Sequence, residues 1–212
     1  MANKGIVIFG AGGHGKVVLD ILLESKRKVV GFIDDNKAKK GKIINGYSIL
    51  GGWDCLKGNK NIEIALGIGD NKVREELFNR AKKEGFPVTR AIHPRAIVSK
   101  TAKIGQGVVI MAGAVINPSV IIEDGVVINT GATVDHDCYL KKFCHIWPGA
   151  NLAGTVIVGK YSYVGTGAAV IQNITIGDNT IIGAGAVVIS DVSSGVTAVG
   201  VPSKTIKGEK RR

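Results

Sequence analysis

The chain has 212 residues, of which 45% are hydrophobic and 5% aromatic, and its formal net charge is +11. This length allows two modest domains with a buried core. No apolar run is long enough for a membrane span or a secretory signal, so a cytoplasmic location is expected. The basic residues are scattered and lack interleaved aromatic residues, which argues against a nucleic-acid surface and favours small anionic ligands as partners.

The first part of the chain alternates strand and helix patterns. Apolar runs predict three strands, and the spacing of apolar residues predicts two helices. In chain order these elements cover 6–9, 16–24, 29–33, 62–66 and 72–84. The alternation predicts a small Rossmann-like α/β domain over residues 1–90, followed by a second domain.

A glycine-rich loop follows the first predicted strand, and two aspartates end the second. The glycines match the G-x-G-x-x-G pattern, and the aspartates come about twenty residues on, as in dinucleotide-binding domains. The loop is Gly10-Ala11-Gly12-Gly13-His14-Gly15, and the aspartates are Asp34 and Asp35. Such a loop lets backbone N–H groups approach a phosphate, and a carboxylate can accept from a ribose or a base. The domain is too short for a complete NAD fold, so a smaller nucleotide ligand is expected.

A six-residue repeat dominates the rest of the chain. From Ile92 to Val188 an aliphatic anchor stands at every sixth position, which neither a strand nor a helix period produces. The residue two places before each anchor is mostly small or β-branched, so both side chains should point inward. Gly, Asn or Asp often occupies the fourth place counted from the anchor, as a corner with unusual φ demands. The pattern predicts a parallel β-helix over 91–193 with three sides to a coil, and a basic tail over 194–212.

His136 lies at a predicted corner of this prism, between Asp135 and Asp137. A carboxylate beside an imidazole orients it and favours its charged form, which makes it a better proton acceptor. His136 is therefore an acid–base candidate, with a surface histidine among carboxylates as the alternative. Gly154 should lie one coil above His136, where its N–H would stabilise an oxyanion.

Over its whole length the chain resembles the NeuD/PglD family of sugar acetyltransferases. The matching stretches are the glycine-rich loop through Val17, Phe32-Ile33-Asp34-Asp35, residues 129–137, His145 and Gly200-Val201-Pro202-Ser203-Lys204. The resemblance implies a left-handed β-helix, although the usual rule for parallel crossovers would predict the right hand. It also implies acetyl-CoA as cosubstrate, no metal, and a homotrimer with active sites at subunit interfaces.

The resemblance further assigns roles to individual residues. The expected catalytic residues are the general base His136, its supporting carboxylate Asp137, and Asp135 as the substitute for that carboxylate. The expected substrate-binding residues are Gly12, Gly13 and His14 for the diphosphate, Asp34 and Asp35 for the ribose or base, Gly69, and Asn129 for the sugar. The expected acetyl-CoA contacts are His145, Gly154, Thr166 and Ala184. As an alternative for His14, its side chain would simply face water.

The predicted function is acetyl transfer from acetyl-CoA to the amine of a nucleotide-linked amino sugar in bacterial glycan biosynthesis. A UDP-linked 4-amino-4,6-dideoxy sugar is the expected acceptor. Three alternatives remain: O-acetylation of sialic acid or another sugar, a zinc-dependent carbonic anhydrase with three histidine ligands, and a scaffold or ligand sensor without chemistry. Nucleotide binding by the first domain distinguishes the first alternative, and metal content distinguishes the second.

Overall fold

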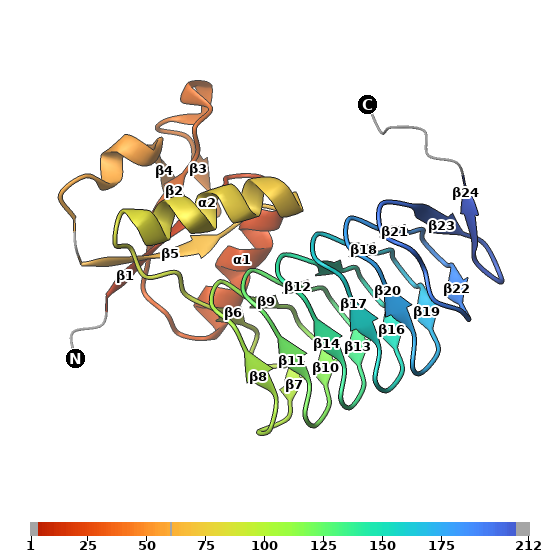
Figure 1. Ribbon diagram of the computed structural model, residues 1–212. Helices are drawn as coiled ribbons and strands as arrows, with labels where there is room; N and C mark the ends of the chain where they lie inside the picture. The colour runs from red at the N-terminus through yellow and green to blue at the C-terminus, as the bar shows by residue number, and fades with distance from the viewer. Residues whose placement is uncertain (1–3, 60, 207–212) are drawn as a thin grey trace. The chain divides into compact units, whose positions relative to one another are not determined.

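The computed structural model describes residues 4–59 and 61–206. The chain divides into two compact units, Met1–Pro94 and Arg95–Arg212 (Figure 1). The first unit mixes strands and helices, whereas the second is built from short strands alone, in agreement with the predicted fold class. None of the described helices is long and apolar enough to cross a membrane.

The first unit contains a five-stranded sheet in the order β3-β4-β2-β1-β5. Its strands are β1 (Gly5–Phe9), β2 (Val29–Ile33), β3 (Ile43–Ile44), β4 (Tyr47–Gly51) and β5 (Ile62–Leu66). The order β4-β2-β1-β5 is parallel, and β3 pairs antiparallel with β4. The sequence analysis missed β3 and β4, although Asn45 and Gly46, both with positive φ, form a typical hairpin turn between them.

Two helices and two short 3₁₀ turns complete the first unit. They are α1 (Gly13–Glu24), α2 (Asn71–Lys83), η1 (Lys37–Lys39) and η2 (Trp53–Leu56). The apolar residues Val18, Leu19, Ile21 and Leu22 of α1 are buried, as the helical spacing predicts. α1 begins at Gly13 rather than at the predicted residue 16, because Gly12 is its N-cap. The glycine-rich loop therefore supplies the first turn of the helix.

The second unit is a left-handed parallel β-helix with three faces, whose coils run from green to blue in Figure 1. Face 1 holds β7 (Ile97–Val98), β10 (Val115–Ile116), β13 (Thr133–Val134), β16 (Asn151–Leu152), β19 (Ala169–Val170) and β22 (Val187–Val188). Face 2 holds β8 (Lys103–Ile104), β11 (Ile121–Ile122), β14 (Tyr139–Leu140), β17 (Ile157–Val158) and β20 (Thr175–Ile176). Face 3 holds β9 (Val109–Ile110), β12 (Val127–Ile128), β15 (His145–Ile146), β18 (Tyr163–Val164), β21 (Ile181–Ile182), β23 (Thr197–Val199) and β24 (Lys204–Ile206). One further strand, β6 (Ala91–Ile92), precedes the β-helix in the chain.

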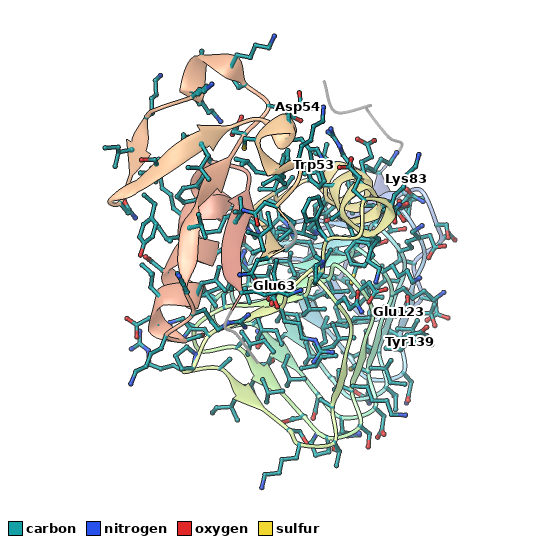
Figure 2. The ribbon with its side chains drawn as sticks, turned by 90° about the vertical axis from the view of Figure 1, so that its left-hand side faces the viewer. Trp53, Asp54, Glu63, Lys83, Glu123 and Tyr139 are labelled. Atoms are coloured by element: carbon teal, nitrogen blue, oxygen red, sulfur yellow. The ribbon has the colours of Figure 1, made fainter. Side chains whose placement is uncertain are left out.

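The register of the coils is the predicted one. Thr133 pairs with Val115 of the coil before it and with Asn151 of the coil after it, so each coil takes three hexads. The anchor Val134 and the small residue Ala132 are fully buried, whereas Thr133 between them faces outward. On face 2 the Tyr139 hydroxyl donates to the Glu123 carboxylate of the preceding coil (Figure 2).

The corners have the left-handed backbone that the glycine pattern predicts. All the predicted corner residues have positive φ: Gly107, Gly113, Gly125, Gly131, Asp137, Gly149, Gly167, Asn173, Asn179 and Gly185. The same place also holds Ser119, Phe143, Thr155 and Tyr161 with positive φ. Stacked corners therefore impose this conformation even on a β-branched residue such as Thr155, for which it is unfavourable.

The stretch expected as a tail, 194–212, is ordered over its described part. β23 continues face 3 in parallel with β21, and β24 turns back antiparallel to β23. The peptide bond between Val201 and Pro202, in the turn between them, is cis. The basic end, Lys210-Arg211-Arg212, lies outside the described residues.

Candidate active site

His136 lies at the corner that joins face 1 to face 2, and its side chain is 57% exposed. Its Nδ1 is 2.8 Å from Oδ2 of Asp137. Asp137 occupies the corner place with φ 61°, a conformation that Asp tolerates better than most residues. With Nδ1 donating to the carboxylate, Nε2 carries the lone pair and can accept a proton.

Asp135 holds the backbone of this corner instead of the imidazole. Its Oδ1 accepts from the backbone N–H of His136 at 2.8 Å and from Nδ2 of Asn117 at 2.6 Å. Asn117 lies one coil before Asp135, and the sequence analysis missed it. The eighteen-residue spacing between Asn117 and Asp135 could have identified it, because this spacing places the two polar side chains one above the other. Of the two candidate carboxylates, Asp137 is thus the one in contact with the imidazole.

The carboxylates shift the protonation of the histidine. The hydrogen bond to Asp137 and, next, the negative charge of Asp135 raise the pKa of His136 above its usual value. The pKa of the Asp135 carboxyl is lowered, chiefly by the hydrogen bond from Asn117. The Asp135 carboxyl is therefore charged near neutral pH, and the His136 imidazole is a stronger base than an isolated one.

Gly154 lies one coil above His136, as predicted. A Cβ placed on Gly154 would lie 2.6 Å from Cε1 and 2.7 Å from Nε2, so the ring packs directly against this glycine. The N–H of the next residue, Thr155, donates to the carbonyl of His136 at 2.9 Å. The N–H of Gly154 itself makes no hydrogen bond within the part of the chain that the structure describes. It is therefore available to a ligand oxygen beside Nε2.

This uncapped N–H differs from several others at the same place of the repeat. The N–H groups of Gln106, Lys142 and Lys160 donate to side-chain carboxylates of other coils. The N–H groups of Thr166 and Ala184, like that of Gly154, have no acceptor among residues 4–59 and 61–206. Thr166 and Ala184 lie one above the other, but at the corner between faces 3 and 1. The expected acetyl-CoA contacts thus occupy two different corners of one chain.

His145 and Asn129 lie together on face 3. His145 is 4% exposed, and its ring centroid is 5.6 Å from that of Trp147 and 6.1 Å from that of Tyr163. Its Nε2 is 3.3 Å from Nδ2 of Asn129. Asn129 therefore accompanies His145 and not His136, which lies at another corner. The sequence analysis missed the two aromatic neighbours, because outward positions of the repeat carry no pattern of their own.

An open groove of about 470 Å³ runs along face 1 beside the corner of Asp135 and His136. Asn117, Thr133, Asp135 and Asn151 contribute its polar side chains, and Ala153, which precedes Gly154, also lines it. A groove of this size is large enough for part of an extended ligand.

In the first unit, the N-termini of the two helices differ. Gly12, the N-cap of α1, has no side chain to cap the helix, and a Cβ on Gly12 or Gly13 would meet nothing within 4 Å. At the start of α2 the carboxylate of Asp70 accepts from the N–H groups of Lys72 and Val73. Within the described residues no side chain caps the N-terminus of α1, which suits an anion, whereas the N-terminus of α2 is capped by Asp70.

The loops after β1 and β5 are in close backbone contact. A Cβ on Gly15 would lie 1.9 Å from the carbonyl oxygen of Gly10, and one on Gly67 would lie 2.8 Å from the same atom. These glycines let the two loops and the start of α1 approach one another. The contact brings the segment of Gly69 to the glycine-rich loop, and a Cβ on Gly69 would meet nothing within 4 Å.

His14 is turned into the protein, contrary to the alternative that its side chain faces water. Its Nε2 is inaccessible to solvent, and burial together with the nearby Arg74 guanidinium lowers the pKa of His14 to about 4. Arg74 is fully buried and donates to the carbonyls of Ile68 at 3.3 Å and Gly69 at 3.0 Å. His14 is therefore neutral at pH 7, so its imidazole brings no positive charge to a phosphate.

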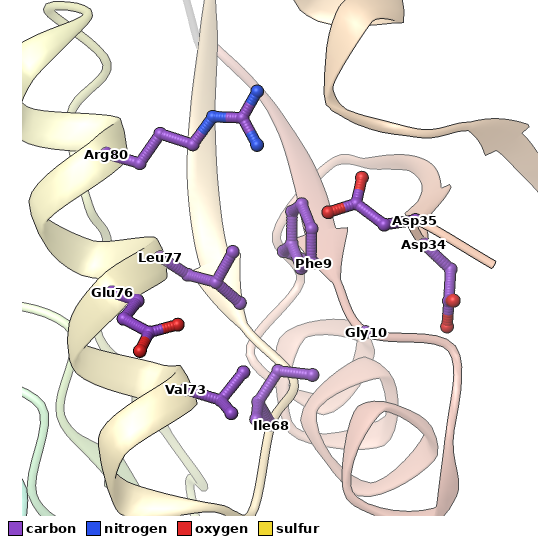
Figure 3. A pocket seen from close by; sticks show the side chains of 9 residues that line it. All are labelled: Phe9, Gly10, Asp34, Asp35, Ile68, Val73, Glu76, Leu77 and Arg80. Carbon is purple, nitrogen blue, oxygen red and sulfur yellow. The ribbon is translucent and has the colours of Figure 1, made fainter.

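Asp34 and Asp35 have different environments. Asp34 accepts from the Ala11 N–H at 3.1 Å and from Nζ of Lys39 at 2.7 Å, so it ties the end of β2 to the glycine-rich loop. Burial raises the pKa of Asp34, but these hydrogen bonds outweigh it and hold the pKa below its usual value. Asp35 lines a cavity with Phe9 and Arg80, and Asp34 lines the same cavity (Figure 3).

A metal site would need several ligand side chains close together. Among the described residues, no three His, Cys, Asp or Glu side chains are grouped so that they could hold a metal ion. His136 lies at a corner, His145 on face 3, and the buried His93 belongs to the first unit.

Comparisons with known proteins cover both units. Residues 5–81 match the PglD N-terminal domain, and residues 101–136 match the bacterial transferase hexapeptide repeat. The chain is 41% identical to GDP-perosamine N-acetyltransferase from Caulobacter crescentus, solved with CoA and GDP-perosamine in a variant with one histidine replaced by alanine. That match covers 98% of this chain and 99% of the other, with a TM-score of 0.93.

Two further relatives are also named as acetyltransferases. The acetyltransferase domain of PglB from Neisseria gonorrhoeae, solved with acetyl coenzyme A, is 38% identical over 97% of this chain and 100% of the other, with a TM-score of 0.91. UDP-N-acetylbacillosamine N-acetyltransferase from Bacillus subtilis is 36% identical over 120 residues. This last match spans about half of each protein, 51% of this chain and 52% of the relative.

Proposed function

The chain belongs to the PglD family of hexapeptide-repeat sugar acetyltransferases, and from this membership we propose that it acetylates the amine of a nucleotide-linked amino sugar. Acetyl-CoA is the acetyl donor. The observation that carries the proposal is the pairing of an exposed His136 with Asp137, beside the uncapped N–H of Gly154. The cytoplasm, where acetyl-CoA is made, remains the expected location.

The chemistry of one step follows from this corner. The sugar amine attacks the thioester carbonyl, and His136 Nε2 takes the proton that the nitrogen loses. The N–H of Gly154 donates to the oxyanion as the new C–N bond forms. When the C–S bond breaks, CoA leaves as a thiolate that takes up the proton from the His136 imidazolium, which restores the base. Asp137 stabilises the imidazolium that exists during the step.

The first unit would bind the nucleotide. The open N-terminus of α1, with Gly12 and Gly13, suits the diphosphate, and Asp35 suits the base or ribose. Asp34 lines the same cavity, and its carboxylate also holds the glycine-rich loop. UDP remains the nucleotide of the substrate that we predict from the sequence. GDP is a second candidate, because the relative from Caulobacter crescentus was solved with GDP-perosamine.

The residues expected to contact acetyl-CoA lie in separate places on one chain, and this separation supports a homotrimer as part of the proposal. His136 and Gly154 lie at one corner, whereas Thr166 and Ala184 lie at another and His145 on face 3. One chain therefore does not gather all of them around one thioester. Two neighbouring chains would do so if His145 of one came near His136 of the next. Asn129 would then accompany His145 in the same site.

The acceptor distinguishes this function from its nearest rival, O-acetylation. We expect CoA release with nucleotide-linked amino sugars and an amide product, identified by mass spectrometry and by resistance to mild alkali. The matching nucleotide-linked sugars with a hydroxyl in place of the amine should give rates at least about 100-fold lower, because a hydroxyl is the weaker nucleophile and is placed by the same contacts. Turnover of free sialic acid instead would establish the O-acetyl alternative, and a chain that releases no CoA with any acceptor would be a scaffold or sensor.

Asp137→Asn should move the pH profile of acetyl transfer. The base works in its deprotonated form, so kcat/KM falls as the pH drops through the pKa of His136. Asp137 raises that pKa, and its removal should shift the acid limb to lower pH while the plateau falls by about 10-fold or more. Asp178→Asn is the matched control, because Asp178 caps another corner at Lys160. An acid limb that stays at the wild-type position would contradict the assigned pairing.

A further inference from the structure

A cavity of about 390 Å³ lies at the carboxyl ends of the strands in the first unit. Figure 3 shows it between the end of β1, the loop after β5 and helix α2. Phe9 and Leu77 form apolar walls, and Asp35 and Arg80 extend toward it from opposite sides. Gly10, which also lines it, opens the glycine-rich loop that leads to α1. A ligand phosphate at α1 would therefore bring the rest of the nucleotide to this cavity.

Trp53 holds both polar groups of the cavity in place. Its backbone N–H donates to Oδ1 of Asp35 at 3.2 Å, and the Arg80 guanidinium lies 4.5 Å from the centroid of its ring. Glu84 accepts from Trp53 Nε1 at 2.7 Å and pairs with Nε of Arg80 at 3.4 Å. Trp53 itself is 2% exposed, so this arrangement is anchored in the core.

The remaining polar atoms are left for a ligand. Within the described residues, Oδ2 of Asp35 and the two terminal nitrogens of Arg80 make no hydrogen bond. The cavity therefore presents a free acceptor on Asp35 and free donors on Arg80 above apolar walls, and the carboxylates of Asp34 and Glu76 also line it. A flat ring with a donor next to an acceptor on its edge would satisfy both groups.

We propose that this cavity selects nucleobases with a ring N–H beside a carbonyl, so that guanine and uracil nucleotides bind and adenine and cytosine nucleotides are rejected. The inference rests on the proposed function and specifies its substrate class. The ring N–H of guanine or uracil donates to Asp35, and the neighbouring carbonyl accepts from Arg80. Phe9 and Leu77 pack against the faces of the ring.

Adenine and cytosine reverse this pattern. Their ring nitrogen at the corresponding position carries a lone pair, which would face the Asp35 carboxylate, and an amino group replaces the carbonyl opposite Arg80. Both contacts become repulsive or unsatisfied, and a polar site left unpaired discriminates strongly. Because Asp35 and Arg80 are partly exposed, we expect a ratio of affinities of about 10-fold or more, below the limit for a closed site.

The test is calorimetric titration of the full chain with GDP, IDP, UDP, ADP and CDP. GDP, IDP and UDP should bind at least about 10-fold more tightly than ADP and CDP. Asp35→Asn should reduce this ratio to about 2-fold or less, because the amide oxygen still accepts from Trp53 and an NH2 donor then replaces the carboxylate oxygen that accepts from the ring N–H. Asp54→Asn is the matched control, since Asp54 follows Trp53 directly but its side chain is 83% exposed at the surface (Figure 2).

A second variant tests the same proposal independently, in case Asp35→Asn does not fold. Arg80→Met keeps an apolar stem over Trp53 but loses the donors, and it should narrow the ratio as well. Equal affinity for all five nucleotides, or an unchanged ratio in both variants, would overturn the selection of the base and leave the proposed function intact. Binding of none of the five would remove the nucleotide site itself and with it both proposals.

Discussion

His136→Asn is expected to lower kcat/KM for acetyl transfer by about 10²–10⁴-fold, the usual contribution of a general base. Asparagine has no group that takes up a proton near neutral pH, so the amine must lose its proton to water. The loss should fall on kcat, because the ring acts on the reacting nitrogen and not on the nucleotide. Steady-state assays that follow release of the CoA thiol measure both constants.

Two controls separate this effect from misfolding. The His136 side chain is 57% exposed, so the variant should keep its melting temperature, and titration with nucleoside diphosphates should give wild-type affinity. The profile of kcat/KM against pH should also lose its acid limb. A variant that retains more than about a tenth of wild-type kcat/KM would exclude His136 as the base, since that loss lies below the range of general-base catalysis.

Gly154→Ala is expected to reduce turnover by about 10²-fold, because the new methyl group would lie 2.6 Å from the His136 ring. The ring must move, and it carries Nε2 away from the N–H that faces the oxyanion. The backbone itself tolerates alanine at this place of the repeat, which Ala112 and Ala184 occupy elsewhere. The cause of the loss would therefore be the clash with the imidazole.

A double variant tests that cause. In the background of His136→Ala the ring is absent, so adding Gly154→Ala should change neither the melting temperature nor the residual rate by more than about 2-fold. In the wild-type background the same change should lower the melting temperature or the rate. If Gly154→Ala is as harmful without the ring as with it, the contact between these residues does not explain its effect.

The β-helix could be predicted almost completely from the sequence, because the residues that point inward repeat every six positions. Each coil buries the same places, and each corner needs the same backbone conformation. Stacking at eighteen residues then places Gly154 over His136 without further information. The non-glycine corners such as Phe143 and Thr155 could not be foreseen, since neighbouring coils impose their conformation.

The first unit shows where a sequence motif is insufficient. The dinucleotide pattern located the open end of α1, but it does not indicate that the Asp34 carboxylate also binds the Ala11 N–H and Lys39. The cavity around Asp35 depends on Trp53 and Arg80, which come from different elements and share no local motif. Such contacts arise only when the sheet and α2 have folded together.

The most direct test of the central claim is the rate of CoA release with GDP- and UDP-linked amino sugars, compared with the same amino sugars free of nucleotide, at saturating acetyl-CoA. We predict turnover with at least one nucleotide-linked amino sugar, an N-acetylated product, and kcat/KM at least about 100-fold lower for the free sugar, because the nucleotide supplies the binding energy that positions the amine. Equal turnover of the free amino sugar, or no turnover with any nucleotide-linked amine, would contradict the account.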